Sequence, residues 1–121
     1  MKADCCGVTM DCVFCKIANK ELPAGVVYED GEILCFHDLS PQAPVHVLII
    51  PKEHIASLDD LSERHIELLG RMMSKVREIA ALLGLENGYR LACNCGKDGL
   101  QTVGHLHFHL LGGRQMGWPP G

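Results

Sequence analysis

Hydrophobic residues recur at steps of three and four between Ile66 and Leu83, the strongest periodic pattern in the chain. This spacing places them on one face of a helix. Ser62 supplies an N-cap and Gly84 a C-terminal stop, so we expect one long helix here. Further apolar positions widen the stripe, which fits either a deeply buried helix or one whose flank packs against a second subunit. The stripe comprises Ile66, Leu69, Met73, Val76, Ala80 and Leu83, and the widening positions are Leu68, Met72, Ile79 and Leu82.

Shorter runs of β-branched and aromatic residues predict strands on both sides of this helix. The first two runs flank Glu29-Asp30-Gly31, and an Asp-Gly pair in such a place is typical of a hairpin turn. A short helix capped by Asp11 precedes them, from Cys12 to Ala18. The order of elements predicts an α+β domain with a mostly antiparallel sheet of about five strands. The predicted strands span residues 26–28, 33–36, 45–50, 89–94 and 105–111.

Composition limits the class of protein and of partner. The 121 residues suffice for one domain, which we place at 12–121 after a lead-in at 1–11. The net charge is -4 and the chain has no dense Lys/Arg run, so the sequence gives no sign of a basic surface that would bind long nucleic acid. No apolar stretch approaches the roughly 20 residues of a membrane span, and no export signal is visible, so we expect a cytoplasmic protein without membrane contact. The seven cysteines then suit reduced thiols or a metal better than a disulfide framework.

Three histidines alternate with apolar residues in the segment His105–Leu111. At the two-residue period of a strand, His105, His107 and His109 share one face. The outer two Cα atoms would lie roughly 13 Å apart, which is too far for both rings to reach one metal ion easily. The three rings are therefore expected to do different jobs. A central imidazole suits nucleophilic attack on phosphorus, while its neighbours bind phosphate oxygens or pass protons.

The loop before this segment, residues 94–104, contains amides, a hydroxyl and several glycines. Such loops let backbone N–H groups approach an anion. The sequence is not a Walker loop, and by itself the pattern fits an ordinary strand connection as well as a phosphate site.

Together these segments resemble the histidine triad nucleotide-binding family, specifically its Hint branch of purine nucleoside phosphoramidases. The similarity runs from Cys12 to Gly121, so that the single domain ends in a tail at 112–121. The tail is the feature that separates Hint proteins from other branches. The matching motifs are Phe36–Pro44, His46, Ile50-Pro51-Lys52 with His54, the triad segment and Gly112–Gly121.

The resemblance implies a mechanism and assigns residues to it. His107 would attack the α-phosphate and form a nucleotidyl-histidine intermediate, which water then hydrolyses. His109 would contact phosphate and assist protonation of the leaving group, and His105 would complete the catalytic triad. Amide or hydroxyl donors would stabilise the charge that grows on the phosphoryl oxygens. The implied nucleotide contacts are Asp38 at the ribose, Leu39 at the base, and His46, Asn94, Leu100, Gln101 and Thr102 around the phosphate.

Two of these positions depart from the family pattern, which commonly has glycine where Leu100 stands and serine where Thr102 stands. Thr102 keeps the hydroxyl group. Leu100 adds bulk beside the phosphate, which bears on the rate and on the leaving group more than on the type of reaction.

Cys12 and Cys15 are separated by two residues, a spacing that lets both thiolates reach one tetrahedral ion. One such pair alone is more often unliganded, and a redox pair is a further alternative. The resemblance adds His54 and His105, because several bacterial members bind structural zinc through the equivalent four residues. This shell would fix His105 and leave His107 free, and catalysis itself would require no cofactor.

Three functions remain in competition at this point. The resemblance favours a phosphoramidase that acts on purine nucleoside monophosphates carrying an amine. The alternatives are a dinucleoside polyphosphate hydrolase, as in the Fhit-like branch, and a nucleotide-binding regulatory protein with residual catalysis. The resemblance also implies a homodimer, with the long helix and a strand at the interface and Trp118 near the partner's active site.

Overall fold

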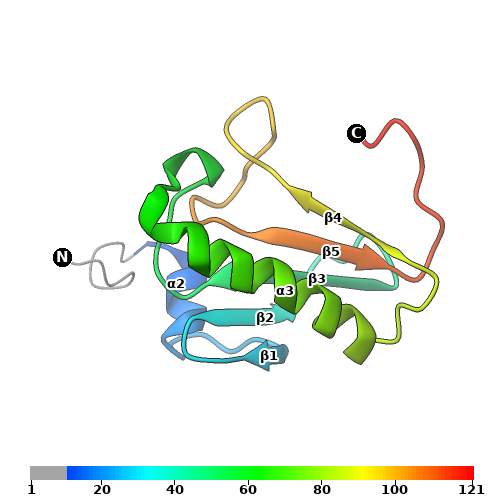
Figure 1. Ribbon diagram of the computed structural model, residues 1–121, viewed down its shortest axis with the longest axis horizontal. Helices are drawn as coiled ribbons and strands as arrows, with labels where there is room; N and C mark the ends of the chain where they lie inside the picture. Colours follow the sequence, from blue (N-terminus) through cyan, green and yellow to red (C-terminus); the bar gives the residue numbers. More distant parts are fainter. Residues whose placement is uncertain (1–10) are drawn as a thin grey trace.

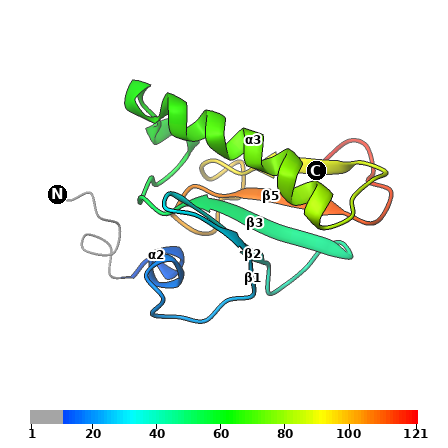
Figure 2. The ribbon, with the colours of Figure 1, turned by 60° about the horizontal axis from the view of Figure 1, so that its bottom comes forward.

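The computed structural model describes residues 11–121, so most of the expected lead-in lies outside the described residues. It consists of one antiparallel five-stranded sheet in the order β1-β2-β3-β5-β4, which confirms the predicted α+β class. A long helix, α3, crosses one face of the sheet, and the short helix α2 lies against the opposite face (Figures 1 and 2). The elements are α2 (Val13–Ala18), β1 (Val26–Glu29), β2 (Ile33–His37), β3 (Val45–Pro51), α3 (Ile66–Leu82), β4 (Tyr89–Cys93) and β5 (Phe108–Gly112).

Each face of the sheet has its own hydrophobic core, because side chains alternate along every strand. The larger core lies under α3 and the smaller one under α2. The α3 side buries Ile33, Cys35, Val47, Ile49, Phe108 and Leu110 against Leu68, Met72, Val76 and Ile79. The α2 side buries Leu34, Phe36, Leu48 and Ile50 against Phe14 and Ala18.

The strand register carries a histidine onto the α2 side. Phe36 pairs with Leu48, Leu48 pairs with His109, and His109 pairs with Ala92. Directly paired residues point to the same face of an antiparallel sheet, so His109 lies in line with the apolar residues under α2. Phe108, one residue earlier, belongs to the core under α3.

The last strand is shorter than predicted: we expected it to span residues 105–111, but β5 begins only at Phe108. The neighbouring strand β3 ends at Pro51, which has no N–H to continue the ladder. The Pro51 carbonyl is instead 2.8 Å from the His105 ring, and Leu106 N donates to Ile55 O. His105 and His107 therefore stand on an irregular segment that side-chain contacts hold in place.

Both predicted helices differ in detail from the expectation. The N-cap of α2 is Cys12, not Asp11, and its Sγ accepts a hydrogen bond from Cys15 N at 3.3 Å. Ser62 caps a short 3-10 turn at Glu63–His65, after which α3 begins. Gly84 follows the end of α3 with φ +75, as its role as a stop requires.

The buried face of α3 is rotated from the predicted stripe. Leu68, Met72 and Ile79, predicted as widening positions, lie at its centre, whereas Ile66 is 64% exposed and Leu82 is 66% exposed. The helix is therefore not deeply buried all round, and its two ends present apolar side chains to solvent. Among the described residues, no helix is long and apolar enough to cross a membrane.

Candidate functional site

A cavity of about 290 Å³ opens on the α2 side of the sheet. Its walls combine an apolar side, suited to a flat ring, with a few polar groups that converge from distant parts of the chain. The apolar walls come from Val13, Phe14, Ile17, Pro23, Ala24, Phe36, Leu39, Leu48 and Val103, and the polar groups are His37, Asp38, Thr102, His107 and His109.

The geometry around His107 fixes which of its nitrogens can react. The side chain is only 4% exposed, and its Nδ1 lies 2.7 Å from the carbonyl oxygen of His105. A carbonyl oxygen only accepts, so Nδ1 carries the proton and donates. The neutral ring then has its lone pair on Nε2. Phe14 packs edge-on against the ring, with centroids 5.1 Å apart, and holds its plane.

His109 is oriented by His46 in the same way, through a chain of hydrogen bonds whose direction is set by a backbone amide. Gln42 N donates to His46 Nδ1 at 3.0 Å, which leaves the His46 proton on Nε2. That Nε2–H lies 2.9 Å from His109 Nδ1 and donates to it. The remaining proton of neutral His109 is therefore on its own Nε2. Burial lowers the pKa of both rings, and Asp38, with Oδ2 3.5 Å from His46 Nε2, opposes this only in part.

Asp38 and Leu39 stand at the mouth of the cavity, directly after β2. Ser40 N donates to Asp38 Oδ1 at 2.7 Å, which fixes the carboxylate in a turn. Leu39 lines the cavity and is 97% exposed, so its side chain is accessible from solvent.

The glycine-containing loop divides its polar residues between two tasks. The amide of Asn94 donates to Gly99 O, and that of Gln101 accepts from Gly96 N and donates to Ala56 O. These two residues, predicted to hold phosphate, thus brace the loop itself. Thr102 lines the cavity. Leu100 adopts φ +60 and is 74% exposed, and it is not part of the cavity wall.

The predicted zinc ligands come together in a separate cluster. Cys12, Cys15, His54 and His105 each place one ligand atom within 4.8 Å of the others. Cys12 Sγ is 3.3 Å from His105 Nδ1, and Cys15 Sγ is 3.2 Å from His54 Nδ1. Because His105 Nε2 donates to the Pro51 carbonyl, its Nδ1 offers a lone pair to the cluster. Two sulfurs and two ring nitrogens around one centre fit tetrahedral zinc.

His105 therefore belongs to the cysteine–histidine cluster and is not part of the cavity wall. Burial lowers its pKa to about 4, and burial also lowers the pKa of His54. The contribution of His105 to the cavity is its backbone carbonyl, which orients His107.

The apolar half of the cavity was not predicted from the sequence. The residues concerned come from α2, β2, β3 and the glycine-containing loop, and only the fold brings these four segments together: Phe14, Ile17, Phe36, Leu48 and Val103. Their hydrophobicity alone marked them as core. A usable signal was present in the amphipathic spacing of Phe14 and Ile17 beside the two cysteines of α2.

Two further buried residues, His65 and Cys35, have ordinary surroundings. His65 is buried, accepts from Ser62 N and lies 3.3 Å from Glu53 Oε2, so it is a satisfied core histidine. Cys35 is buried in the core, and burial raises the pKa of its thiol to about 12, which makes it inert. Cys5 and Cys6 lie outside the described residues.

The fold and the histidine site define the class of protein, and comparison with known proteins agrees. A family model described as "Scavenger mRNA decapping enzyme C-term binding" matches residues 11–118. A HIT family hydrolase from Legionella pneumophila superposes with a TM-score of 0.90 at 54% identity, over 92% of this chain and 100% of that chain. The chain belongs to the histidine triad (HIT) family.

Two curated relatives are similar over almost their whole length. An uncharacterized HIT-like protein of Synechococcus elongatus is 53% identical over 92% of this chain and 97% of its own. A 14 kDa zinc-binding protein of Zea mays is 52% identical over 90% of this chain and 87% of its own.

Proposed function

We propose that this protein is a hydrolase that cleaves the phosphorus–nitrogen bond of purine nucleoside 5'-phosphoramidates. The observation that carries the proposal is the complementary hydrogen bonding of two histidines in one cavity, whose ring centroids are 5.1 Å apart. The Nδ1 bond of His107 to a carbonyl implies an unprotonated Nε2, and the Nδ1 bond of His109 to His46 implies a protonated Nε2. A nucleophile and a proton donor are the two groups that displacement of an amine from phosphorus requires.

The reaction follows from these two atoms. His107 Nε2 attacks the α-phosphorus, a P–N bond to the histidine forms, and the P–N bond to the amine breaks. His109 Nε2–H supplies the proton that the departing amine takes, and the negative charge that this leaves on the His109 ring is balanced by the positive charge on the phosphorylated His107 ring, whose centroid is 5.1 Å away. His109 then accepts a proton from water, whose oxygen attacks phosphorus and releases His107. Thr102, which lines the cavity, would donate its hydroxyl to a phosphoryl oxygen on which charge grows.

The rest of the cavity suits the nucleoside. Its apolar walls, with Phe14, Ile17 and Phe36, would hold the purine ring by contact area, without base-specific hydrogen bonds. Asp38 at the mouth would accept hydrogen bonds from the ribose hydroxyls through its Oδ2. Leu39, exposed in the structure, would cover the outer side of the ring.

The cysteine–histidine cluster would hold a structural zinc ion, as the name of the Zea mays relative suggests for that protein. Bound zinc would supply cross-linking of the α2 start, the residue 54 loop and His105. It would take no part in bond making or breaking. Its effect on the reaction would pass through the position of the His105 carbonyl, which accepts from His107.

The decisive test is steady-state hydrolysis of adenosine 5'-phosphoramidate beside a dinucleoside polyphosphate, with wild type and His107→Ala. We expect AMP release from the phosphoramidate that vanishes in the variant, while AMP binding by calorimetry persists. Preferred cleavage of the dinucleoside polyphosphate would transfer the proposal to that reaction class. Tight AMP binding without wild-type turnover on either substrate would make the protein a regulatory nucleotide binder.

We also propose a homodimer, in which the free edge of the sheet is covered. β4 is an edge strand, and edge strands of this length present unpaired N–H and C=O groups. Tyr89 on β4 is 43% exposed, and Leu82 at the adjacent end of α3 is 66% exposed. Light scattering after size exclusion should give twice the chain mass, and a stable monomer would contradict the proposal.

A further inference from the structure

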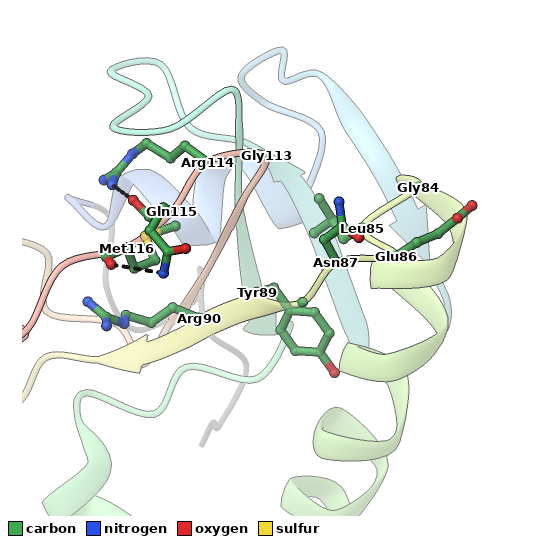
Figure 3. A pocket seen from close by; sticks show the side chains of 11 residues that line it. Gly84, Leu85, Glu86, Asn87, Tyr89, Arg90, Gly113, Arg114, Gln115 and Met116 are labelled. Carbon is green, nitrogen blue, oxygen red and sulfur yellow. Dashed lines mark hydrogen bonds between the residues drawn. The ribbon is translucent and has the colours of Figure 1, made fainter.

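The C-terminal tail contacts the catalytic half of the molecule through one arginine. Arg114 lines a second cavity of about 590 Å³, which lies between the connection from α3 to β4 and the start of the tail (Figure 3). From there, its Nε and Nη2 donate to the carbonyl oxygen of Gln42 at 3.1 and 3.0 Å. Its Nη1 donates to Gln115 O at 3.1 Å, which holds the guanidinium in place. Two bonds that converge on one oxygen fix both the distance and the direction of the guanidinium.

The approach of the tail to this loop depends on glycine. Gly113 has φ +89, and a Cβ added there would lie 2.9 Å from the Pro44 side chain. At Gly112 an added Cβ would lie 2.6 Å from Leu85. The backbone is thus pressed against Pro44 of the β2–β3 loop at Gly113 and against Leu85 at Gly112, so the arginine meets Gln42 from a defined position.

Gln42 is the residue whose N–H sets the proton positions in the pair formed by His46 and His109. Its carbonyl is held by Arg114, and its N–H donates to His46 Nδ1, which in turn places a proton between His46 and His109. The side chain of Gln42 is exposed and reaches only Ser40 O within its own loop. Within the described residues, Arg114 is the contact that ties Gln42 to the tail.

We propose that Arg114 is a positioning residue for the reaction, which keeps the proton of His109 on Nε2 by holding Gln42 against His46. The inference rests on the proposed function and deepens it. We call the two hydrogen bonds from Arg114 to Gln42 O the clamp. Without the clamp, residue 42 turns more freely, and His46 interconverts between its two neutral tautomers. When His46 carries its proton on Nδ1, His109 Nδ1 loses its donor. A part of His109 then carries its proton on Nδ1, where it faces His46 and not the leaving group.

The same geometry weighs against a metal at this place. Asp38, His46 and His109 each have a ligand atom within 4.8 Å of the others, as a divalent cation would require. His46 would have to bind the cation through Nε2. The Gln42 N–H occupies Nδ1, however, so Nε2 is the atom that carries the proton. The arrangement fits a hydrogen-bond relay.

The test compares Arg114→Ala and Arg114→Lys with Arg90→Ala. Arg90 makes the matched contact, from β4 to the tail carbonyl of Gly117 at 2.9 Å, without touching Gln42. In the full-length protein, long-range nitrogen–proton spectra of ¹⁵N-histidine report which ring nitrogen is protonated. We expect His46 and His109 to be pure Nε2–H forms in the wild type and in Arg90→Ala, and mixed forms in Arg114→Ala.

Turnover gives the second readout, with a phosphoramidate of an alkylamine and one of an aromatic amine. The alkylamine departs poorly without a proton, so Arg114→Ala should lower its kcat about tenfold, a fraction of the usual contribution of general acid catalysis. The aromatic amine should lose less, KM should stay near the wild-type value, and Arg114→Lys should recover part of the loss.

Unchanged histidine forms in Arg114→Ala, or an equal loss for both amines and for Arg90→Ala, would overturn the inference. Arg114→Lys provides the same readouts if the alanine variant does not fold. The spectra need no substrate, so they test the clamp separately from the reaction. If His107→Ala kept its turnover, the proposed function would fail while the spectra still decided about the clamp.

Discussion

Two histidine clusters lie side by side in this protein, and they differ in which ring nitrogen the backbone occupies. In the cysteine–histidine cluster, His105 donates from Nε2 to the Pro51 carbonyl and leaves Nδ1 for the sulfurs. Two residues later, His107 donates from Nδ1 to the His105 carbonyl and leaves Nε2 for the cavity. The same side chain thus offers Nδ1 to a pair of sulfurs in one place and Nε2 to the cavity in the next. The partner of the other nitrogen makes the difference.

The largest expected effect is on turnover, and it should differ between variants in the two clusters. His107→Ala removes the nucleophile, and turnover of a phosphoramidate should fall by roughly 10⁴-fold or more. His54→Ala, in the other cluster, should lower the zinc content while AMP still binds and a much larger share of the activity remains. Stopped assays and elemental analysis measure both properties. An equal loss of turnover in the two variants would show that the clusters are not functionally distinct.

Removal of zinc should then lower the thermal stability of the protein only where the cysteine–histidine cluster is intact. At free zinc a thousandfold above its Kd, bound zinc adds about 4 kcal/mol to the free energy of unfolding. A chelator should therefore lower the Tm of the wild type, measured by calorimetry. Cys12→Ser should already unfold at the lower temperature and respond little to the chelator. Cys95→Ser, which alters a thiol outside the cluster, is the control and should respond like the wild type.

Lowering the pH should reduce the stability that comes from the buried neutral rings of His46 and His109. Burial lowers the pKa of His46 and of His109 in the folded state below the ordinary value of 6.5. The unfolded chain therefore binds more protons below that value. The stabilisation from the neutral rings is complete above about pH 6.5 and is lost as the pH falls through the folded pKa. Urea unfolding between about pH 7 and pH 5 should show this decline.

His46→Gln removes one of the buried rings whose pKa is lowered and keeps hydrogen-bonding capacity, so its decline with falling pH should be shallower than that of the wild type. A steeper decline, or stability that rises on acidification in both proteins, would show that these histidines are not held neutral by burial.

The smallest effect concerns the loop that leads into both clusters. Leu100 has φ +60, a conformation that costs a residue with a side chain roughly 1–2 kcal/mol relative to glycine. Leu100→Gly should therefore raise the free energy of unfolding by about 1 kcal/mol, measured by urea unfolding, because glycine's own entropy offsets part of the gain. Lys97→Gly, in the same loop without a positive φ, should be neutral or destabilising. A loss of stability in Leu100→Gly would speak against strain at this position.

Sequence patterns located the elements well where the local signal was strong. The Asp-Gly turn and its two flanking runs became β1 and β2, and Gly84 ends the long helix as expected. The rotation of the buried face of α3 was missed, because the apolar side of the helix is wide and the predicted stripe follows only one of its edges. The start of β5 was missed because alternation looks the same whether a segment pairs with a strand or, as at Leu106, with a loop residue such as Ile55.

The sequence also predicted some of the candidate site residues better than others. The three alternating histidines and the cysteine pair indicated histidine and thiolate chemistry through residue identity and spacing alone. The predicted phosphate contacts of Asn94 and Gln101 show the limit, because both amides already have backbone partners, Asn94 within the loop and Gln101 within the loop and at Ala56. An amide side chain beside glycines fits a phosphate contact and a loop brace equally well, and only the neighbouring carbonyls decide between them.

By itself, the sequence determined the set of reactive groups and the order of the elements, since these depend on residue identity and on local periodicity. Only the tertiary structure decided what each histidine does. The proton position of an imidazole is set by the single group that faces its second nitrogen. For His105, His107 and His46 these groups are the carbonyls of Pro51 and His105 and the amide of Gln42. Of these three, the Pro51 carbonyl comes from a distant segment, and no spacing in the chain records it.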